Sequence, residues 1–134
     1  MECFVPGQPV TEGSTRALVT RSGRPVVLHD NPALQRYRTS IAWVAHAAMQ
    51  VQPVTCDVCV SLHFAVGPTG NHRRLDLDKL TRAVLDALTG IVYKDDAQVA
   101  ELHCERVAAS DAVRAGVWIE VETIPDECRD AVRE

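Results

Sequence analysis

Residues 75–90 read LDLDKLTRAVLDALTG, and residues 93–99 read YKDDAQV. The apolar positions of the first stretch recur at spacings of three and four, so they predict a helix over about 76–88 with one buried stripe. That stripe consists of Leu77, Leu80, Val84 and Leu88. Thr89-Gly90 predicts the end of the helix, because glycine readily adopts the backbone conformation that terminates one. Two aspartates thus begin this helix, and two more follow it before the next apolar segment.

The segments before this helix predict a strand, a basic loop, a longer helix and a second strand. An apolar opening with two prolines indicates an edge strand over residues 1–10. Residues 11–30 are basic and rich in turn residues, which leaves a long mobile loop and a loose hairpin open as interpretations. Asn31-Pro32 predicts a helix start, and an apolar stripe carries that helix to about Gln50. The stripe consists of Leu34, Tyr37, Ile41, Val44 and Ala48.

Three further segments complete the expected fold. Residues 54–66 alternate with a period of two, which predicts a strand with one buried face. Strands are also expected at about 98–107 and 115–124, and the polar tail over 125–134 is expected to be frayed. These elements predict an α+β fold in which a roughly four-stranded mixed sheet packs with two main helices, as a single domain over residues 1–134.

Composition and charge exclude some classes of protein. Hydrophobic residues make up 46% of the 134 residues and charged residues 24%, which is typical of a globular protein. No apolar run is long enough to span a bilayer and no secretory signal is visible, so we expect a cytoplasmic protein without a membrane partner. Residues 1–75 carry seven arginines and four acids (+3), whereas residues 76–134 carry seven basic and fourteen acidic residues (−7), giving the net −4. The mean charge therefore does not decide whether the protein binds nucleic acid.

The cysteines are predicted to be free thiols. Their odd number and scattered spacing, in a chain without a visible secretory signal, do not suggest a disulfide framework. Cys56 and Cys59 form a C-x-x-C pair, but in a strand over 54–66 their side chains would point to opposite faces and could not chelate one ion. We therefore expect no zinc site at this pair. The five are Cys3, Cys56, Cys59, Cys104 and Cys128.

The aspartates carry the most specific chemistry. Asp76 and Asp78 fall at a helix start, where free backbone N–H groups and the helix dipole favour anions. Asp95 and Asp96 lie between this helix and the next strand, so a returning chain can bring one of them back beside Asp76. Three oxygen ligands completed by water suit Mg²⁺ or Mn²⁺ rather than zinc. Such a site can activate water and stabilise charge on a phosphodiester.

Spacing alone favours a plainer interpretation of the same residues. Asp76 can be only an N-cap, Asp78 a surface residue favoured by the helix dipole, and Asp95-Asp96 a turn. Arg82 can likewise be part of a surface bridge, because it lies four residues after Asp78 and four before Asp86 on one helix face.

The two stretches together resemble the signature of the RusA family of Holliday-junction resolvases. That signature reads D-L-D-N-L-x-K-x-x-x-D-A-L and then, after a short gap, D-D-x-Q-V; the matching stretches here are residues 76–88 and 95–99. The opening VPGQP of residues 5–9 and the order of the expected elements are similar to the family as well. Two positions depart from the signature: its asparagine is Lys79 here, and its lysine is Arg82.

The resemblance implies a metal-dependent endodeoxyribonuclease that resolves four-way junctions by paired symmetric nicks, with Mg²⁺ (or Mn²⁺) and no organic cofactor. The family's metal-binding catalytic aspartates match Asp76, Asp78 and Asp96. Asp95 matches a supporting acid, which we include among the candidate metal ligands, and Asp86 a structural one. Arg82 or Lys79 is expected to offset charge in the transition state.

The resemblance also implies branched DNA as partner and a phage or prophage role in DNA recombination and repair. Paired nicks imply a homodimer with two-fold symmetry, to which Trp43 or Trp118 could contribute. Basic residues of two loops are expected to bind the DNA backbone; they are Arg16, Arg21, Arg24, His72, Arg73 and Arg74. For His72, a role as proton donor and a role as phosphate contact or bystander both stay open.

Two competing functions rank below a junction resolvase, because the three aspartates are intact and the loops are rich in arginine. One is a dimer that binds branched DNA and has lost cleavage through the changes at Lys79 and Arg82. The other is a metal-dependent phosphohydrolase of small molecules, which predicts a closed pocket and no affinity for DNA.

Overall fold

A four-stranded sheet forms the centre of the computed structural model, which describes residues 1–11, 16–28, 32–67 and 75–125. The strand order is β1-β6-β4-β5. β6 runs antiparallel to both of its neighbours, whereas β4 and β5 are parallel, so the sheet is mixed. The strands are β1 (Glu2–Pro6), β4 (Val58–Val66), β5 (Val99–Ala108) and β6 (Gly116–Thr123).

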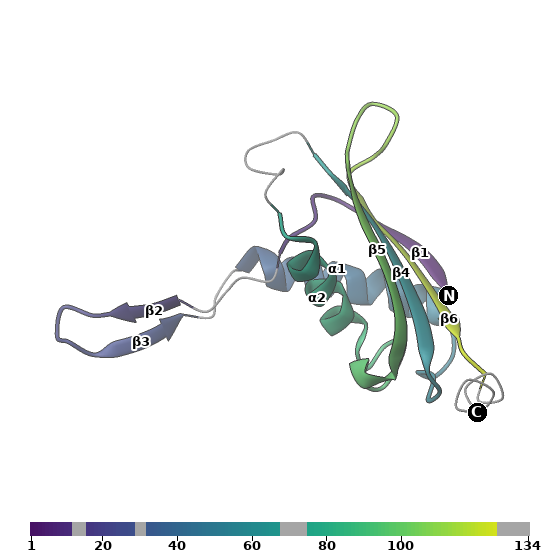
Figure 1. Ribbon diagram of the computed structural model, residues 1–134, viewed down its shortest axis with the longest axis horizontal. Helices are drawn as coiled ribbons and strands as arrows, with labels where there is room; N and C mark the ends of the chain where they lie inside the picture. The colour runs from purple at the N-terminus through teal and green to yellow at the C-terminus, as the bar shows by residue number, and fades with distance from the viewer. Residues whose placement is uncertain (12–15, 29–31, 68–74, 126–134) are drawn as a thin grey trace.

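Two helices, α1 (Pro32–Met49) and α2 (Leu77–Leu88), lie on one face of this sheet (Figure 1). The fold is α+β in a single domain, as predicted. Alternate residues of β4 point toward the helices and are fully buried, because each strand turns every second side chain to the same face. The core joins these side chains to Leu80, Val84 and Leu88 of α2 and to Ile41 of α1. The opposite face of the sheet, which we call the outer face, carries Ser61, His63 and Trp118 among its residues.

The helices follow the predicted periodicity closely. α1 ends at Met49, where Gln50 adopts a left-handed conformation with a φ of 53°. The predicted stripe is wrong at one position: Ala45 is fully buried and Ala48 is exposed. The reason is that the last turn of the helix is exposed on most of its surface. In the described part of the chain, no helix combines the length and apolar character that crossing a membrane takes.

The strand predicted over residues 54–66 begins only at Val58. Val54 forms an isolated bridge with Tyr93, and Cys56 lies outside any strand. The cause is a distant side chain: the amide nitrogen of Gln98 donates to the carbonyl oxygens of Val54 (2.9 Å) and Cys56 (2.8 Å). Because Cys56 lies outside the strand, the alternation of side chains along a strand does not determine where the Cys56 side chain points. The four cysteines among the described residues are free, as predicted, and Cys128 lies outside them.

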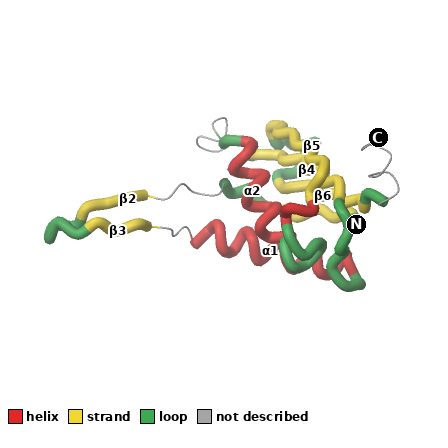
Figure 2. The backbone as a smooth tube through the Cα atoms, turned by 60° about the horizontal axis from the view of Figure 1, so that its bottom comes forward, coloured by secondary structure: helices red, strands yellow, loops and turns green. Residues whose placement is uncertain are grey.

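Within residues 11–30, the described part forms a hairpin of β2 (Arg16–Val19) and β3 (Pro25–Leu28). Figures 1 and 2 both show this hairpin apart from the main sheet. Its turn is closed by backbone bonds from Thr20 to the Arg24 carbonyl (2.9 Å) and from Gly23 to the Thr20 carbonyl (2.8 Å). Gly23 takes a φ of 79°, which glycine adopts without steric cost.

Candidate active site

The start of α2 presents two exposed carboxylates. Asp76 is the N-cap residue, with an extended backbone and no capping bond from its side chain, so its carboxylate does not cap the N-terminus of the helix. The Lys79 ammonium lies 3.8 Å from this carboxylate. Asp78 lies in the first turn and accepts a bond of 2.9 Å from the Lys79 backbone N–H. Both carboxylates therefore remain open to solvent at the positive end of the helix dipole.

The second pair of aspartates divides between two roles. A short 3-10 helix, η2 (Asp96–Gln98), follows α2, and Asp95 is its N-cap. The Asp95 carboxylate accepts from the Ala97 N–H (2.9 Å), and the Gln98 side chain accepts in return from the Asp95 N–H (3.0 Å). This reciprocal capping box fixes the turn. Asp96 is the acid that faces α2, where its carboxylate lies 3.5 Å from Arg82.

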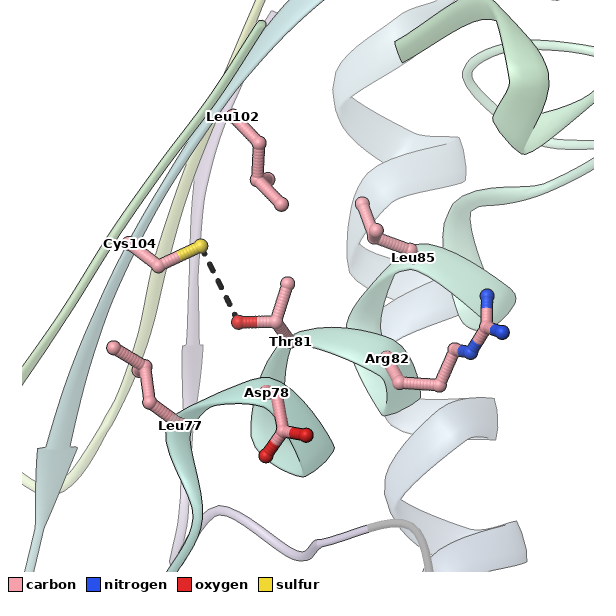
Figure 3. Close-up of a pocket in the computed structure, with 7 residues that line it drawn as sticks. All are labelled: Leu77, Asp78, Thr81, Arg82, Leu85, Leu102 and Cys104. Atoms are coloured by element: carbon pink, nitrogen blue, oxygen red, sulfur yellow. Dashed lines mark hydrogen bonds between the residues drawn. The ribbon is translucent and has the colours of Figure 1, made fainter.

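Beside Asp78, an open hollow lies between α2 and β5 (Figure 3). Its floor is apolar, and the Thr81 hydroxyl donates across it to the sulfur of Cys104 at 3.2 Å. Figure 3 shows Arg82 extending away from the strand. The lining residues are Leu77, Asp78, Thr81, Arg82, Leu85, Leu102 and Cys104. This hollow is open to solvent rather than enclosed.

Asp76 and Asp78 lie at the start of α2, and Asp96 lies beside Arg82, one turn after Asp78, but the oxygens of the three aspartates do not all meet. Among the described residues, the only group of three or more metal-ligating side chains within 4.8 Å of one another consists of Cys59, Glu101 and His103. The positions of the carboxylates follow the nearby cations: Lys79 lies beside Asp76, and Arg82 beside Asp96. Exposed ion pairs of this kind contribute little energy, so the carboxylates can turn.

The donor set fits a hard divalent cation. All three candidate ligands are carboxylates, and their side chains are exposed or half-buried, which leaves room for the waters that Mg²⁺ retains. The turn that carries Asp96 is held independently, by the capping box and by the bonds of Gln98. Asp95 already uses one carboxylate oxygen in that box, which favours a supporting role for it.

The remaining sequence candidates fall outside this cluster. Asp86 pairs with Arg38 of α1 at 3.2 Å, so it ties the two helices together rather than bridging to Arg82. Arg21 and Arg24 are exposed at the hairpin turn, and Arg16 is described only as part of β2. His72, Arg73 and Arg74 lie outside the described residues.

Sequence reasoning missed two residues that shape the site. Arg106 of β5 donates to the carbonyl of Leu75, the residue before Asp76, and so holds the start of α2 against the sheet. Cys104 accepts from Thr81. Positions 102, 104 and 106 alternate along β5 and share the face that meets α2, so a period-two pattern in that strand was the available signal.

Comparison with known proteins identifies one family. The family model described as endodeoxyribonuclease RusA matches residues 6–122, which is most of the chain. Among the curated proteins, no match is found.

Proposed function

Because the chain belongs to the RusA family of Holliday-junction-resolving endodeoxyribonucleases, we propose that it cuts four-way DNA junctions by paired symmetric nicks with Mg²⁺ (or Mn²⁺) held by Asp76, Asp78 and Asp96. The observation that carries this proposal is the return of Asp96 to the side of α2. Asp96 is twenty residues beyond the helix start, yet its carboxylate lies against Arg82, one turn after Asp78.

A bound Mg²⁺ would supply a water of lowered pKa and positive charge beside the phosphodiester. The protein's own groups do the rest. Asp76 and Asp78 supply negative charge at an exposed helix start, where a DNA backbone has access. Lys79 and Arg82 place two cations beside these acids, and each can offset charge that develops on a phosphoryl group. Arginine keeps the charge of the family's lysine but contacts oxygen as a planar fork.

Basic residues outside the aspartate cluster would bind the DNA backbone. Arg21 and Arg24 sit at the exposed turn of a hairpin that projects from the domain (Figure 1). A projecting arm with two cations can reach phosphates of a neighbouring duplex arm, which gives salt-dependent and sequence-independent affinity. We assign the same role to Arg16, His72, Arg73 and Arg74. Two symmetric nicks require two active sites, so the working form is a homodimer.

The test is cleavage of a labelled synthetic four-way junction beside a matched linear duplex, with Mg²⁺ or with EDTA. The variants are Asp76→Asn, Asp78→Asn and Asp96→Asn, and the control is Asp111→Asn, an exposed acid in the β5–β6 loop. We expect paired nicks in the junction alone, lost with EDTA and lowered at least about 100-fold in the three site variants. Binding without nicking at any metal concentration would favour the non-catalytic module. Unchanged cleavage by all three variants would refute the assigned ligands.

A further inference from the structure

The outer face of the sheet carries a second group of metal-ligating side chains. Cys59 of β4 and Glu101 and His103 of β5 place a thiol, a carboxylate oxygen and an imidazole nitrogen all within 4.8 Å of one another. The register of the parallel pair creates this group: Cys59 lies opposite Glu101, and His103 is two residues farther along the same strand. Side chains two apart on a strand share a face, so all three project from the outer face.

This group is separate from the candidate active site. Leu102 and Cys104, which alternate with Glu101 and His103 along β5, line the hollow beside Asp78 on the helix side. The edge strand therefore has one face toward the aspartates and the other toward the thiol. The sheet itself lies between the two groups.

We propose that Cys59, Glu101 and His103 bind one divalent cation of the zinc class. Thiolate and imidazole ligands select zinc over Mg²⁺, and zinc accepts a carboxylate oxygen as a further ligand. Bond lengths of about 2.0–2.3 Å put the ligand atoms of a tetrahedral ion about 3.3–3.8 Å apart. The ligand atoms here lie within 4.8 Å of one another, so side-chain rotations that move them about 1 Å closer would give that spacing.

The charge around Cys59 favours a cation at this place. Glu122 of β6 lies opposite Cys59 on the other side of β4 and on the same face. Glu101 and Glu120 share this face as well, and the negative charge of the three carboxylates attracts a divalent ion. Glu122 or a water can complete the coordination.

The site differs from the zinc interpretation of the C-x-x-C pair. Cys59 takes part, but Cys56 lies outside β4 and contributes only its backbone carbonyl to Gln98. The three ligands instead come from two strands that are far apart in the sequence. A bound ion would join β4 to β5, which is the edge strand of the sheet.

The test uses the full chain, purified without metal and titrated with Co²⁺ and with Zn²⁺. Co²⁺ bound by a thiolate gives a charge-transfer absorption band, and a carboxylate site does not. We expect about one equivalent of Co²⁺ with this band, displacement by Zn²⁺, and a rise of several degrees in Tm. Cys59→Ser should abolish the band, and His103→Ala and Glu101→Gln should each weaken binding at least about 100-fold, since even indirect partners of a metal ligand cost 10–100-fold.

Three control variants distinguish this site from other metal ligands. Cys56→Ser tests the neighbouring thiol, and His63→Ala removes an outer-face histidine that pairs with Glu105 instead. Asp76→Asn tests the candidate active site. All three should keep the band and the affinity for Zn²⁺. No charge-transfer band in the wild type, or a band that survives Cys59→Ser, would overturn the proposal. Because the readouts are absorption and affinity, loss of nuclease activity would not affect the result.

Discussion

Replacement of Gln98 by alanine should have two effects: it should destabilise the protein, and it should displace Asp96. The Gln98 amide makes four hydrogen bonds: its oxygen accepts from the backbone N–H groups of Lys94 (2.9 Å) and Asp95 (3.0 Å), and its nitrogen donates to the carbonyls of Val54 (2.9 Å) and Cys56 (2.8 Å). One side chain thus ties the turn that carries Asp96 to the segment that precedes β4.

The size of the loss in stability depends on which hydrogen-bond partners of Gln98 can bind water instead. A neutral hydrogen bond contributes about 1 kcal/mol net, and a buried partner left without one costs more. The two N–H partners are exposed and can bind water, whereas the bonds to the two carbonyls are partly buried. We therefore expect Gln98→Ala to lower the free energy of unfolding by about 2 kcal/mol. For a urea m-value of about 2 kcal/mol/M, the midpoint falls by about 1 M.

The assay is urea unfolding followed by circular dichroism, together with junction cleavage by the folded variant. Gln52→Ala, an exposed glutamine in the loop after α1, serves as the control and should change the midpoint little. Gln98→Glu should be no better than alanine, because a carboxylate cannot donate to the two carbonyls. A midpoint for Gln98→Ala within about 0.2 M of the wild type would refute this reasoning, as would full cleavage activity.

Three further predictions concern the hairpin arm, the start of β6 and the α1–α2 helix pair. Arg24→Ala should reduce the slope of log affinity against log salt for junction binding by about 1, measured by titration at several salt concentrations, if its side chain contacts one phosphate. Gly116→Ala should destabilise the protein by about 1–3 kcal/mol in thermal unfolding, because an added Cβ would lie 2.5 Å from the Val5 carbonyl oxygen. A double-mutant cycle on Arg38 and Asp86 should give a coupling of about 0.5–1 kcal/mol that falls with salt, since both side chains are about one-third exposed.

Each of these predictions has a matched control. Arg36→Ala removes an exposed arginine of α1 and should leave the salt slope unchanged. Gly7→Ala meets no atom within 4 Å and should cost less than Gly116→Ala. For the helix pair, a coupling that persists in high salt would contradict a partly exposed ion pair. An unchanged salt slope for Arg24→Ala would remove Arg24 from the DNA contacts.

Local sequence predicted the elements well because their signals are local. The spacing of Leu80, Val84 and Leu88 is enough to define α2, and the alternation of Val117 and Ile119 is enough to define β6, since each pattern reports one buried face. The start of β4 was wrong because the amide of Gln98, more than forty residues away, takes the carbonyls of the segment before it.

The two candidate sites also differ in how far apart their residues lie in the sequence. The aspartates at the start of α2 and in the following turn were proposed as a site from a motif within 25 residues, and that assignment stays a prediction. The Cys59, Glu101 and His103 group could not be, because it exists only in the register of two parallel strands about forty residues apart in the chain. Arg106 was missed for a related reason: its contact with the Leu75 carbonyl depends on where β5 passes α2.

The position of β6 has a consequence for how the protein folds during synthesis. The last strand in the sequence is an interior strand of the sheet, between β1 and β4, and Met1 itself bonds to the Val121 carbonyl. β1 and β4 cannot be joined through β6 until the ribosome has released the residues of β6. Contacts between such distant segments slow folding, because loop closure must precede them. A nascent chain that stops before Gly116 has both helices and the β4–β5 pair, but it leaves β1 unpaired and one edge of β4 open to chaperones or to other chains.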